Sequence, residues 1–555
     1  MKNSLISLAV LTLSQSLFAQ QLPNAGSQLQ QVPAAPAPVR PAPEIRLERG
    51  TAPVLPSGTA EAKVRVDALR ITGSTLYSEA DLIAASGFVP GREISLTELR
   101  SLAANVTAFY TSKGYFAAQA LLPAQSIQNN TVNMTVSEGR YGKIEVRNKT
   151  KLSNALVMST LSGVQSGDII TSAPLESRLL LLSDLPGVQV KSTLVPGTTP
   201  GTSDLIVDIE PGQRISGSVD VDNAGNRYTG EYRLGGTINL NNPLGLGDVL
   251  SFRGVTSGKG LNYGRAAYQM RFGKATAGVA YSRLNYELGK EFAILGATGK
   301  AEVASVFGSY PLIRSRNSNL SAGLSYDHKR FEDRIDIVPS VTNKKAQVAT
   351  ASLYGNSRDA LGGGGLNLYS AALSTGKLDI QTPAARAADA LSARANGSFN
   401  KLAFTVSRHQ YLTDSLTLVG ALSGQVASKN FDASERMELG GMNGVRAYPQ
   451  GEATGDQGYL LNVEARYLVP QWTGRMPGQL NLIGFVDVGS VTINKNPWEA
   501  GKNSRTLSAA GVGATWGEAN NYLVRAYYAR KLGNEDATSA PDKSGRFWLQ
   551  AIKYF

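Results

Sequence analysis

The region from residue 213 to residue 555 limits the fold most, because apolar and polar side chains alternate along it in many successive runs. In residues 320–327, for example, every second residue from Leu320 to Tyr326 is apolar. The same alternation recurs in residues 416–426 and 461–469, and Gly, Asn, Asp and Pro separate the runs. A side-chain period of two indicates β-strands with one apolar face and one polar face.

This pattern is typical of strands that cross a bilayer with the apolar face toward lipid and the polar face toward a lumen. Each such strand must satisfy its backbone through its neighbours, so the sheet has to close. At roughly 20 residues per strand and connection, the region accommodates about sixteen antiparallel strands. A large soluble β-sandwich is the alternative. We predict a transmembrane β-barrel over residues 213–555, in contact with outer-membrane lipid.

Residues 1–19 have the composition of a secretory signal peptide. Lys2 supplies a positive charge, an apolar run from Leu5 to Leu13 follows, and Ala19 offers a small residue before the cleavage point. The run is too short to cross a bilayer, and no later segment has ~18 consecutive apolar residues. The cleavage position stays open, because Leu17 is larger than the usual pattern prefers. We expect an exported protein.

The composition argues against most catalytic chemistry. The sequence has no cysteine and two histidines, His328 and His409. Catalytic or metal sites made of thiolate or several imidazole groups are therefore disfavoured. Residues 254–260 resemble a phosphate-binding loop only faintly, because the glycine spacing is wrong and no helix follows. The net charge of +12 is spread along the chain without a long basic run, which disfavours nucleic acid. We expect no enzyme, cofactor or metal.

The segment of residues 20–62 is predicted to be a spacer. Asn24–Val32 could form a short polar helix, and five prolines between residues 33 and 43 then favour an extended chain. From residue 63 to residue 212 the pattern changes to compact α+β structure. Two β-α-α-β-β units, residues 63–139 and 140–212, follow one another as an internal repeat.

Within the first unit, we predict a strand over Val64–Ile71, helices over 78–85 and Leu96–Ser112, and strands over Tyr115–Leu122 and 131–138. Ser95 is the expected N-cap of the longer helix. In the second unit, the predicted order is a strand at 143–146, helices at 152–161 and 172–183, and strands at 188–195 and 204–210.

Three stretches of the chain together resemble the TpsB transporters of two-partner secretion, which are outer-membrane pores. The first stretch matches the family's first POTRA domain, at Tyr110, Gly114, Tyr115, Pro123, Gln125, Glu138 and Gly139. Each of these residues, taken alone, can be explained by a structural role. Their combination in this order is what is specific to the family. The second stretch, residues 220–248, resembles the opening of the family's barrel, from the first strand to the first periplasmic turn.

The third stretch resembles the family's long loop that folds back into the barrel lumen, here around residues 436–458. Its motif residues are Gly440, Gly444, Val445, Arg446 and Tyr448. Ala447 stands where the family motif has glycine.

A lumen partner for this loop follows in the strand motif from Phe485 to Gly489. The alternation places Asp487 on the polar, lumen-facing side, where a lone carboxylate favours a cationic partner. By the resemblance, Arg446 pairs with Asp487, and a guanidinium can bind that carboxylate bidentately. The alternative is that Arg446 merely lines a wet pore.

The resemblance implies a monomeric pore that exports an unfolded exoprotein without ATP. Two periplasmic POTRA domains would recognise the exoprotein's amino-terminal secretion domain, and the helix of residues 24–32 would plug the lumen. Phe555, a terminal aromatic, resembles the signal that barrel-assembly machinery reads. An outer-membrane assembly factor and a general porin are the alternatives. The motifs do not distinguish a haemolysin, an adhesin or a contact-dependent inhibition toxin as the exported partner.

Overall fold

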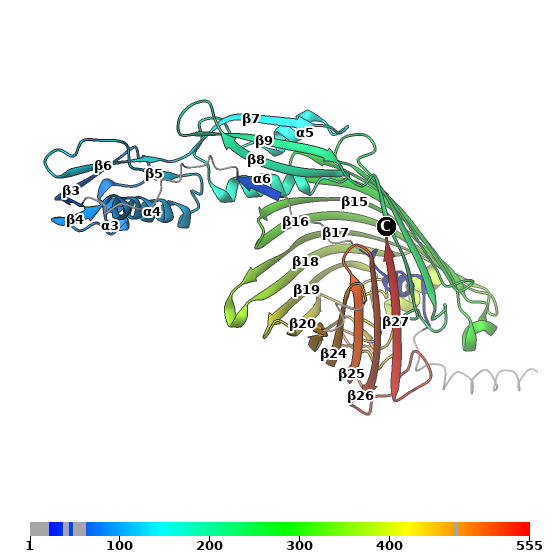
Figure 1. The fold of residues 1–555 in the computed structure, drawn as a ribbon. Coiled ribbons are helices and arrows are strands. Elements are labelled where there is room, and N and C mark those ends of the chain that lie inside the picture. Colours follow the sequence, from blue (N-terminus) through cyan, green and yellow to red (C-terminus); the bar gives the residue numbers. More distant parts are fainter. Residues whose placement is uncertain (1–21, 37–43, 48–62, 471–475) are drawn as a thin grey trace, which may run out of the picture.

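A computed structural model describes residues 22–36, 44–47, 63–470 and 476–555. Sixteen antiparallel strands, β10–β20 and β23–β27, form a closed barrel in which β10 pairs with β27 (Figure 1). The predicted barrel and its strand number are therefore confirmed. The predicted signal peptide lies outside the described residues. Within them, no helix is both long and apolar enough to cross a membrane.

The barrel strands follow one another in chain order, with one interruption between β20 and β23. Their bounds are β10 Ile215–Asp222, β11 Arg233–Asn241, β12 Val249–Thr256, β13 Leu261–Phe272, β14 Ala275–Glu287, β15 Thr298–Arg314, β16 Ser318–Ile335, β17 Ser340–Asp359, β18 Gly365–Ile380, β19 Gly397–Tyr411, β20 Leu416–Ala427, β23 Gln457–Leu468, β24 Gln479–Thr492, β25 Ser504–Glu518, β26 Tyr522–Lys531 and β27 Gly545–Tyr554. The connections carry short helices, η1 (Lys290–Leu295), η2 (Leu361–Gly363) and α7 (Pro383–Leu391).

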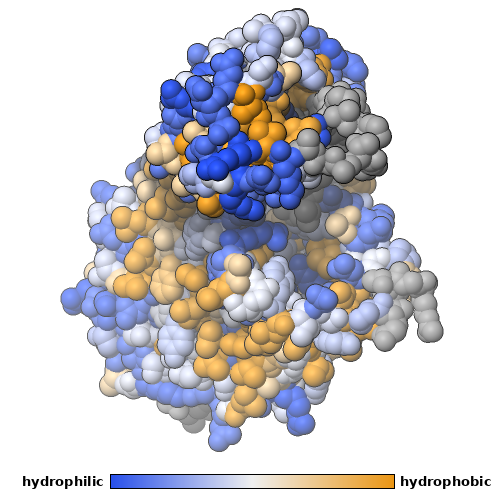
Figure 2. All heavy atoms as spheres, turned by 60° about the vertical axis from the view of Figure 1, so that its left-hand side comes forward, coloured by the Kyte–Doolittle hydropathy of each residue, from blue (hydrophilic) through white to orange (hydrophobic). Residues whose placement is uncertain are grey.

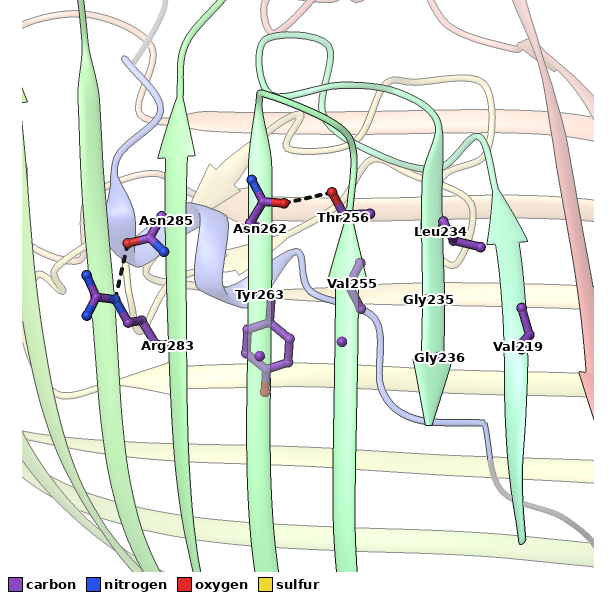
Figure 3. Close-up of a pocket in the computed structure, with 12 residues that line it drawn as sticks. Val219, Leu234, Gly235, Gly236, Val255, Thr256, Asn262, Tyr263, Arg283 and Asn285 are labelled. Carbon is purple, nitrogen blue, oxygen red and sulfur yellow. Dashed lines mark hydrogen bonds between the residues drawn. The ribbon is translucent and has the colours of Figure 1, made fainter. Parts of the chain in front are cut away.

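The outer wall of the barrel is apolar, as the alternation predicts. Leu324 is 70% exposed on β16, and hydrophobic side chains gather in broad patches on the barrel face seen in Figure 2. A shallow groove crosses this wall from β10 to β14, next to Val219 and Leu234 (Figure 3). Its floor is a row of three glycines paired in register, Gly236, Gly254 and Gly264. The groove lies outside the lumen.

The first α+β unit, residues 63–139, folds as two small sheets beside two helices. Its elements are β2 Lys63–Val66, β3 Ala68–Thr72, α3 Glu79–Ser86, β4 Arg92–Ser95, α4 Leu96–Ser112, β5 Gln119–Leu121 and β6 Thr131–Ser137. One sheet pairs β2 with β4, and the other has the order β3-β6-β5. Helix α4 begins where predicted because Ser95 and Glu98 form a capping box.

Two predicted strands of the first unit differ from the structure. The strand expected over Val64–Ile71 breaks at Asp67, whose carboxylate binds Arg65 and Asn130, so β2 and β3 join different sheets. The strand expected over Tyr115–Leu122 is reduced to Gln119–Leu121, because residues 115–118 form a turn after α4.

The second α+β unit, residues 140–212, has one four-stranded sheet. Its elements are β7 Arg140–Asn148, α5 Asn154–Thr160, α6 Ser172–Ser183, β8 Val188–Pro196 and β9 Thr202–Pro211. The fourth strand, β1 (Glu44–Leu47), comes from the spacer, and the sheet order is β1-β8-β9-β7. The observed bounds of the unit's own elements lie within a few residues of the predicted ones.

The second unit is docked on one end of the barrel. Asp184 after α6 binds Arg314 at the end of β15 through two hydrogen bonds of 2.7 and 2.8 Å, and Glu176 pairs with Arg316. The first unit projects away from this end, and β27 finishes on the same side (Figure 1). The α+β units thus stand at a single mouth of the barrel.

Candidate translocation pore and its lumen loop

The long connection between β20 and β23, residues 428–456, folds back into the barrel, and we call it the lumen loop. It contains a small hairpin of β21 (Met437–Glu438) and β22 (Thr454–Gly455). Its tip is inaccessible to solvent, with Val445, Ala447 and Tyr448 all at 0% exposure. These apolar residues pack against inward-facing side chains of the last barrel strands, among them Phe485 and Trp548. The tip of the loop therefore lies inside the lumen and is packed against the inner wall of the barrel.

Arg446 at the loop tip binds Asp487 of β24 bidentately. Its Nε donates to Oδ2 at 2.9 Å and its Nη2 donates to Oδ1 at 2.7 Å. The backbone N–H of Arg446 donates to the same carboxylate at 3.1 Å. Asp487 is fully buried and Arg446 nearly so. Charge-assisted, bidentate bonds of this kind are both stronger and more directional than neutral hydrogen bonds.

Further groups surround the guanidinium of Arg446. Glu464 of β23 accepts from its Nη1 at 2.7 Å, and the ring of Phe485 lies 3.4 Å from its central carbon. Asn462 donates to Asp487, and the indole N–H of Trp548 donates to the carbonyl of Arg446 at 2.7 Å. Glu464 and Trp548 are not among the site residues predicted from the sequence. Strand alternation would have placed both on the lumen side.

The remaining loop and strand motif residues bring backbones close together. A Cβ on Gly444 would collide with the carbonyl of Leu439, and one on Gly489 would lie 2.8 Å from a methyl of Leu439. A Cβ on Gly440 would lie 2.6 Å from the Cβ of Glu452. Ala447, which stands where the family motif has glycine, does not have a positive φ, so its backbone conformation does not require glycine. The Tyr448 hydroxyl donates to the carbonyl of Glu535 at 3.0 Å.

The seven predicted POTRA residues lie together in the first unit, outside the barrel. Glu138 is buried and accepts from the backbone N–H groups of Thr75 and Leu76. Burial would raise the pKa of Glu138, but these bonds and the Thr75 hydroxyl outweigh burial and hold the pKa below its ordinary value. Tyr110 points at the same carboxylate, and its hydroxyl donates to Ser74.

The other members of this set shape turns. Gly114 and Gly139 have positive φ, and Tyr115 bonds back to the carbonyl of Tyr110. Gln125, two residues after Pro123, exchanges two hydrogen bonds with the backbone of Asn133. These residues are structural members of the unit. Phe555 caps the barrel seam, where its backbone pairs with Gly217 and its ring is half exposed.

A short helix, α2 (Ala25–Gln30), occupies the lumen beside the loop. Its N-terminal backbone N–H at Ala25 donates to Asp333 of β16 at 2.7 Å. Its apolar side contacts a buried patch on the inner wall that includes Leu284 and Phe331. Gly26 touches the loop so closely that a Cβ there would lie 2.8 Å from the backbone nitrogen of Ser434.

The C-terminal end of α2 is held by polar contacts. The Gln31 amide donates to Glu438 of the lumen loop at 2.8 Å and accepts from Asn226. Arg233 donates to the Gln31 carbonyl at 2.8 Å. The helix thus bridges the barrel wall and the loop.

A second group of ion pairs, which was not predicted from the sequence, fixes the stem of the lumen loop. Glu435 binds Lys329 of β16 at 2.6 Å and Lys401 of β19 at 2.5 Å. Asp432 binds Lys344 of β17 at 2.8 Å. No periodic pattern runs through the loop, so its acidic residues could not be assigned to a face from the sequence. In the described residues, no cluster of His, Cys, Asp or Glu could hold a metal.

Comparison with known proteins connects this arrangement to a family. Residues 201–516 match the family described as haemolysin secretion/activation protein ShlB/FhaC/HecB, and residues 64–139 match a ShlB-type POTRA domain. The chain belongs to the ShlB/FhaC/HecB family. These are the TpsB transporters of two-partner secretion, which export partner proteins across the outer membrane, with their POTRA domains in the periplasm. The barrel mouth that carries the α+β units therefore faces the periplasm.

Members of this family are similar to the chain over most of its length. The Heme/hemopexin transporter protein HuxB of Haemophilus influenzae is 32% identical over 475 residues, which cover 84% of this chain and 82% of that protein. The outer membrane transporter CdiB of Dickeya dadantii is 25% identical over 460 residues, covering 80% and 79%. These relatives are transporters, which favours export over the assembly-factor and porin alternatives.

Solved structures share the fold. CdiB from Escherichia coli superposes with a TM-score of 0.68 at 19% identity, covering 91% of this chain and 93% of that one. CdiB from Acinetobacter baumannii gives a TM-score of 0.59 at 20% identity and covers 98% of each chain. At these identities the likeness concerns the fold alone.

Proposed function

We propose that this transporter exports one unfolded exoprotein through its barrel lumen, and that α2 and the lumen loop control the passage. The observation that carries the proposal is that both elements occupy the lumen yet are held there by side-chain contacts. Each contact can be broken without opening the barrel wall. A lumen filled in this way can alternate between a closed and a conducting state.

Recognition of the exoprotein takes place in the periplasm. The two α+β units stand at the periplasmic mouth, where an extended chain arriving from the inner membrane meets them first. The amino-terminal secretion domain of the exoprotein is the ligand that the family resemblance implies. Main-chain pairing at sheet edges suits such a ligand, because it holds an extended backbone while demanding little of its sequence.

Clearance of the lumen follows docking. Helix α2 acts as the plug, and its length of six residues makes it a small element to displace. Docking shifts the population from a plugged to an open state if the exoprotein binds the open state more tightly. Folding of the exoprotein outside the cell makes the passage directional without ATP.

Arg446 and Asp487 act as the lock that holds the tip of the lumen loop against β24. A bidentate pair buried among Phe485, Tyr527 and Trp548 fixes one orientation of the tip. The transporter works as a monomer, because one chain closes the whole barrel. Barrel-assembly machinery recognises β27 and the aromatic residue Phe555 that follows it during biogenesis.

Secretion is the test of this function. The transporter would be co-expressed with the large exoprotein encoded beside it, and the exoprotein would be quantified in the culture medium. We expect export with the wild-type transporter and little export with Arg446→Ala or Asp487→Ala, although both variants insert into the outer membrane. Arg466→Ala is the matched control, because Arg466 also binds Glu464 but is more exposed. Equal amounts of exoprotein in the medium without the transporter would refute the proposal.

A further inference from the structure

The outer wall of the barrel changes from apolar to charged along β16. Its outward-facing side chains are apolar up to Leu324 and Tyr326, which are 70% and 46% exposed. The next two positions on the same face are His328 and Arg330. They lie toward the extracellular end, because β16 begins beside Arg314, which contacts the second α+β unit in the periplasm. The change therefore marks the level at which the hydrocarbon of the outer leaflet gives way to its headgroups.

Cations of three neighbouring strands share the outer face just beyond this level. Arg330 of β16 is directly opposite Lys345 of β17 in the sheet register. Lys377 of β18 pairs with Gln347, two residues along β17, so it is a diagonal neighbour of Lys345. Long side chains reach one another across both of these spacings. We call Arg330, Lys345 and Lys377 the cation patch.

The cation patch lacks a counter-charge of the kind that its neighbour has. Arg283 extends from β14 toward β15 (Figure 3), where it pairs with Glu302 at 3.5 Å. Within the described residues, no ion pair engages a member of the patch, although Asp379 of β18 lies opposite Lys345. Like charges that face each other across two strands are destabilising. An anion placed between Arg330 and Lys345 would remove this cost.

The rest of the barrel does not carry such a group of cations at this level. The outward-facing positions near the extracellular ends of β19, β24 and β25 include Asn400, Ser490 and Thr506. On β26 the cation Arg530 faces outward, but Gly545 of the next strand is its neighbour in register. A need for charge common to all strands would place cations around the whole ring. The cation patch instead indicates a local site.

An apolar groove of about 560 Å³ lies on the wall directly below the patch, across strands β12–β16. Its lining includes Tyr281 and Tyr326, which are about half exposed, and His328. Ala304 stands between Tyr281 and His328 in register, and its small side chain leaves space there. Because His328 and Arg330 are two residues apart on one strand, the groove ends about 7 Å from the cation patch. An acyl chain fits a groove of this size and polarity.

The groove and the patch together suit one kind of amphiphile. A guanidinium binds two oxygens of a phosphate group at once, and lysines add compact positive charges. The patch extends over three strands, a width of about 10 Å, which exceeds the size of a single phosphate group. A sugar headgroup that carries more than one phosphate, with several acyl chains below it, matches this width.

We propose that the cation patch and the groove form a binding site for a phosphorylated, multiply acylated glycolipid of the outer leaflet, which is the chemistry of lipid A. Arg330 and Lys345 bind one phosphate group between them, and Lys377 contacts the headgroup over β18. One acyl chain lies in the groove between Tyr281 and Tyr326. The site is on the lipid-facing side of the barrel, separate from the lumen, and does not depend on the proposed function.

Native mass spectrometry of the full-length transporter in detergent tests the patch, with bisphosphorylated lipid A as the probe. We expect the wild type to retain one lipid A molecule. Arg330→Gln should weaken binding about fivefold, and the further change Lys345→Gln should weaken it by a similar factor. Arg530→Gln is the matched control, because it removes an exposed arginine from the same level of the outer wall, and it should bind like the wild type. Equal binding by Arg330→Gln and Arg530→Gln, or no retained lipid A on the wild type, would overturn the inference.

A bulky side chain tests the groove without a change of charge. Ala304 is exposed on the outer wall, so Ala304→Trp fills the groove without disturbing the interior of the protein. We expect this variant to retain less lipid A than the wild type. Ala371→Trp is the control, because Ala371 is also exposed on the outer wall but lies on β18, outside the groove lining. Wild-type binding by Ala304→Trp would show that no acyl chain occupies the groove.

Two other lipids distinguish the occupant. Dephosphorylated lipid A keeps the acyl chains but lacks the phosphate groups, so it should bind the wild type more weakly than bisphosphorylated lipid A does. Phosphatidylglycerol has one phosphate and two acyl chains, and it should not displace bound lipid A at equal concentration. Displacement would reveal a surface for any anionic lipid and overturn the glycolipid assignment. Equal retention of dephosphorylated lipid A would overturn the role of the cation patch.

Discussion

The ammonium group of Lys344 and the carboxylate of Asp432 form a buried ion pair, 2.8 Å between Nζ and Oδ2, that joins strand β17 to the stem of the lumen loop. The same ammonium group lies 4.0 Å from Asp333, which accepts the hydrogen bond from the first turn of α2. The ammonium group of Lys344 thus neutralises carboxylates that hold both the lumen loop and α2.

Loss of this cation should loosen both elements. In Lys344→Met, two carboxylates stay buried without their partner, which typically costs about 3–5 kcal/mol. We expect more frequent openings in planar-bilayer conductance recordings than for the wild type. Lys300→Met is the control, because Lys300 forms a partly exposed pair with Glu332 on neighbouring strands. If Lys344→Met opened no more often than Lys300→Met, the ammonium group of Lys344 would not be what holds the lumen closed.

The geometry of the guanidinium at Arg446 should matter beyond its charge. Lysine keeps the charge but cannot bind both oxygens of Asp487 while also reaching Glu464, so Arg446→Lys is not conservative here. A loss of ~1.4 kcal/mol in loop docking would correspond to about a tenfold change in the docked population. We expect the rate of exoprotein release to fall by that order. Arg466→Lys should export at the wild-type rate, and equal rates for both variants would contradict the lock.

A side chain at Gly26 should push the plug away from the loop. The Cβ of Gly26→Val would lie 2.9 Å from the Cβ of Ser434, closer than such atoms approach in folded proteins. We expect a larger basal conductance, because α2 can relieve the contact only by leaving its position. Gln30→Val changes an exposed residue of the same helix and should conduct like the wild type. An unchanged conductance for Gly26→Val would place the closure elsewhere.

The first unit should lose stability in acid through Glu138. Its pKa is lower in the folded unit than in the unfolded chain, so its stabilisation is complete above the unfolded value of about 4.3 and is lost as the pH falls through the folded value. Glu138→Gln should lower the stability of the unit by about 1.5–3 kcal/mol at pH 7 and remove part of the acid dependence. Hydrogen exchange of α4 in the full chain, compared at pH 7 and at about pH 3, below the unfolded pKa of a glutamate, measures both effects. A wild-type acid dependence in Glu138→Gln would contradict this role.

The parts of the fold that depend on local rules were predictable from the sequence. The alternation predicted barrel strands, the length of the alternating region predicted their number, and the Ser95 cap predicted the start of α4. Strand β1 was not predictable, because four residues in a spacer carry no strand signal and their partner, Lys191 to Leu194, is far away in the chain. Its pairing depends on an edge that exists only after the second unit has folded.

In the candidate site, too, some residues could be predicted from the sequence and others could not. Asp487 could be placed in the lumen from the alternation of its strand, and Arg446 was assigned to it by the family motif. The acidic residues of the loop stem, Asp432 and Glu435, lie in irregular backbone, so no period relates them to Lys344 or Lys401. Their partners are chosen by the three-dimensional path of the loop, which depends on the closed barrel around it.

The hydrogen bond from Trp548 to the carbonyl of Arg446 has a consequence for the order of assembly. Trp548 belongs to β27, the last of the sixteen barrel strands in chain order, whereas Lys329, which binds the loop stem, belongs to β16. The loop therefore collects contacts from both early and late strands of the ring. An unfinished sheet cannot offer all of them, so the loop can make its full set of contacts only after the last strand has closed the ring.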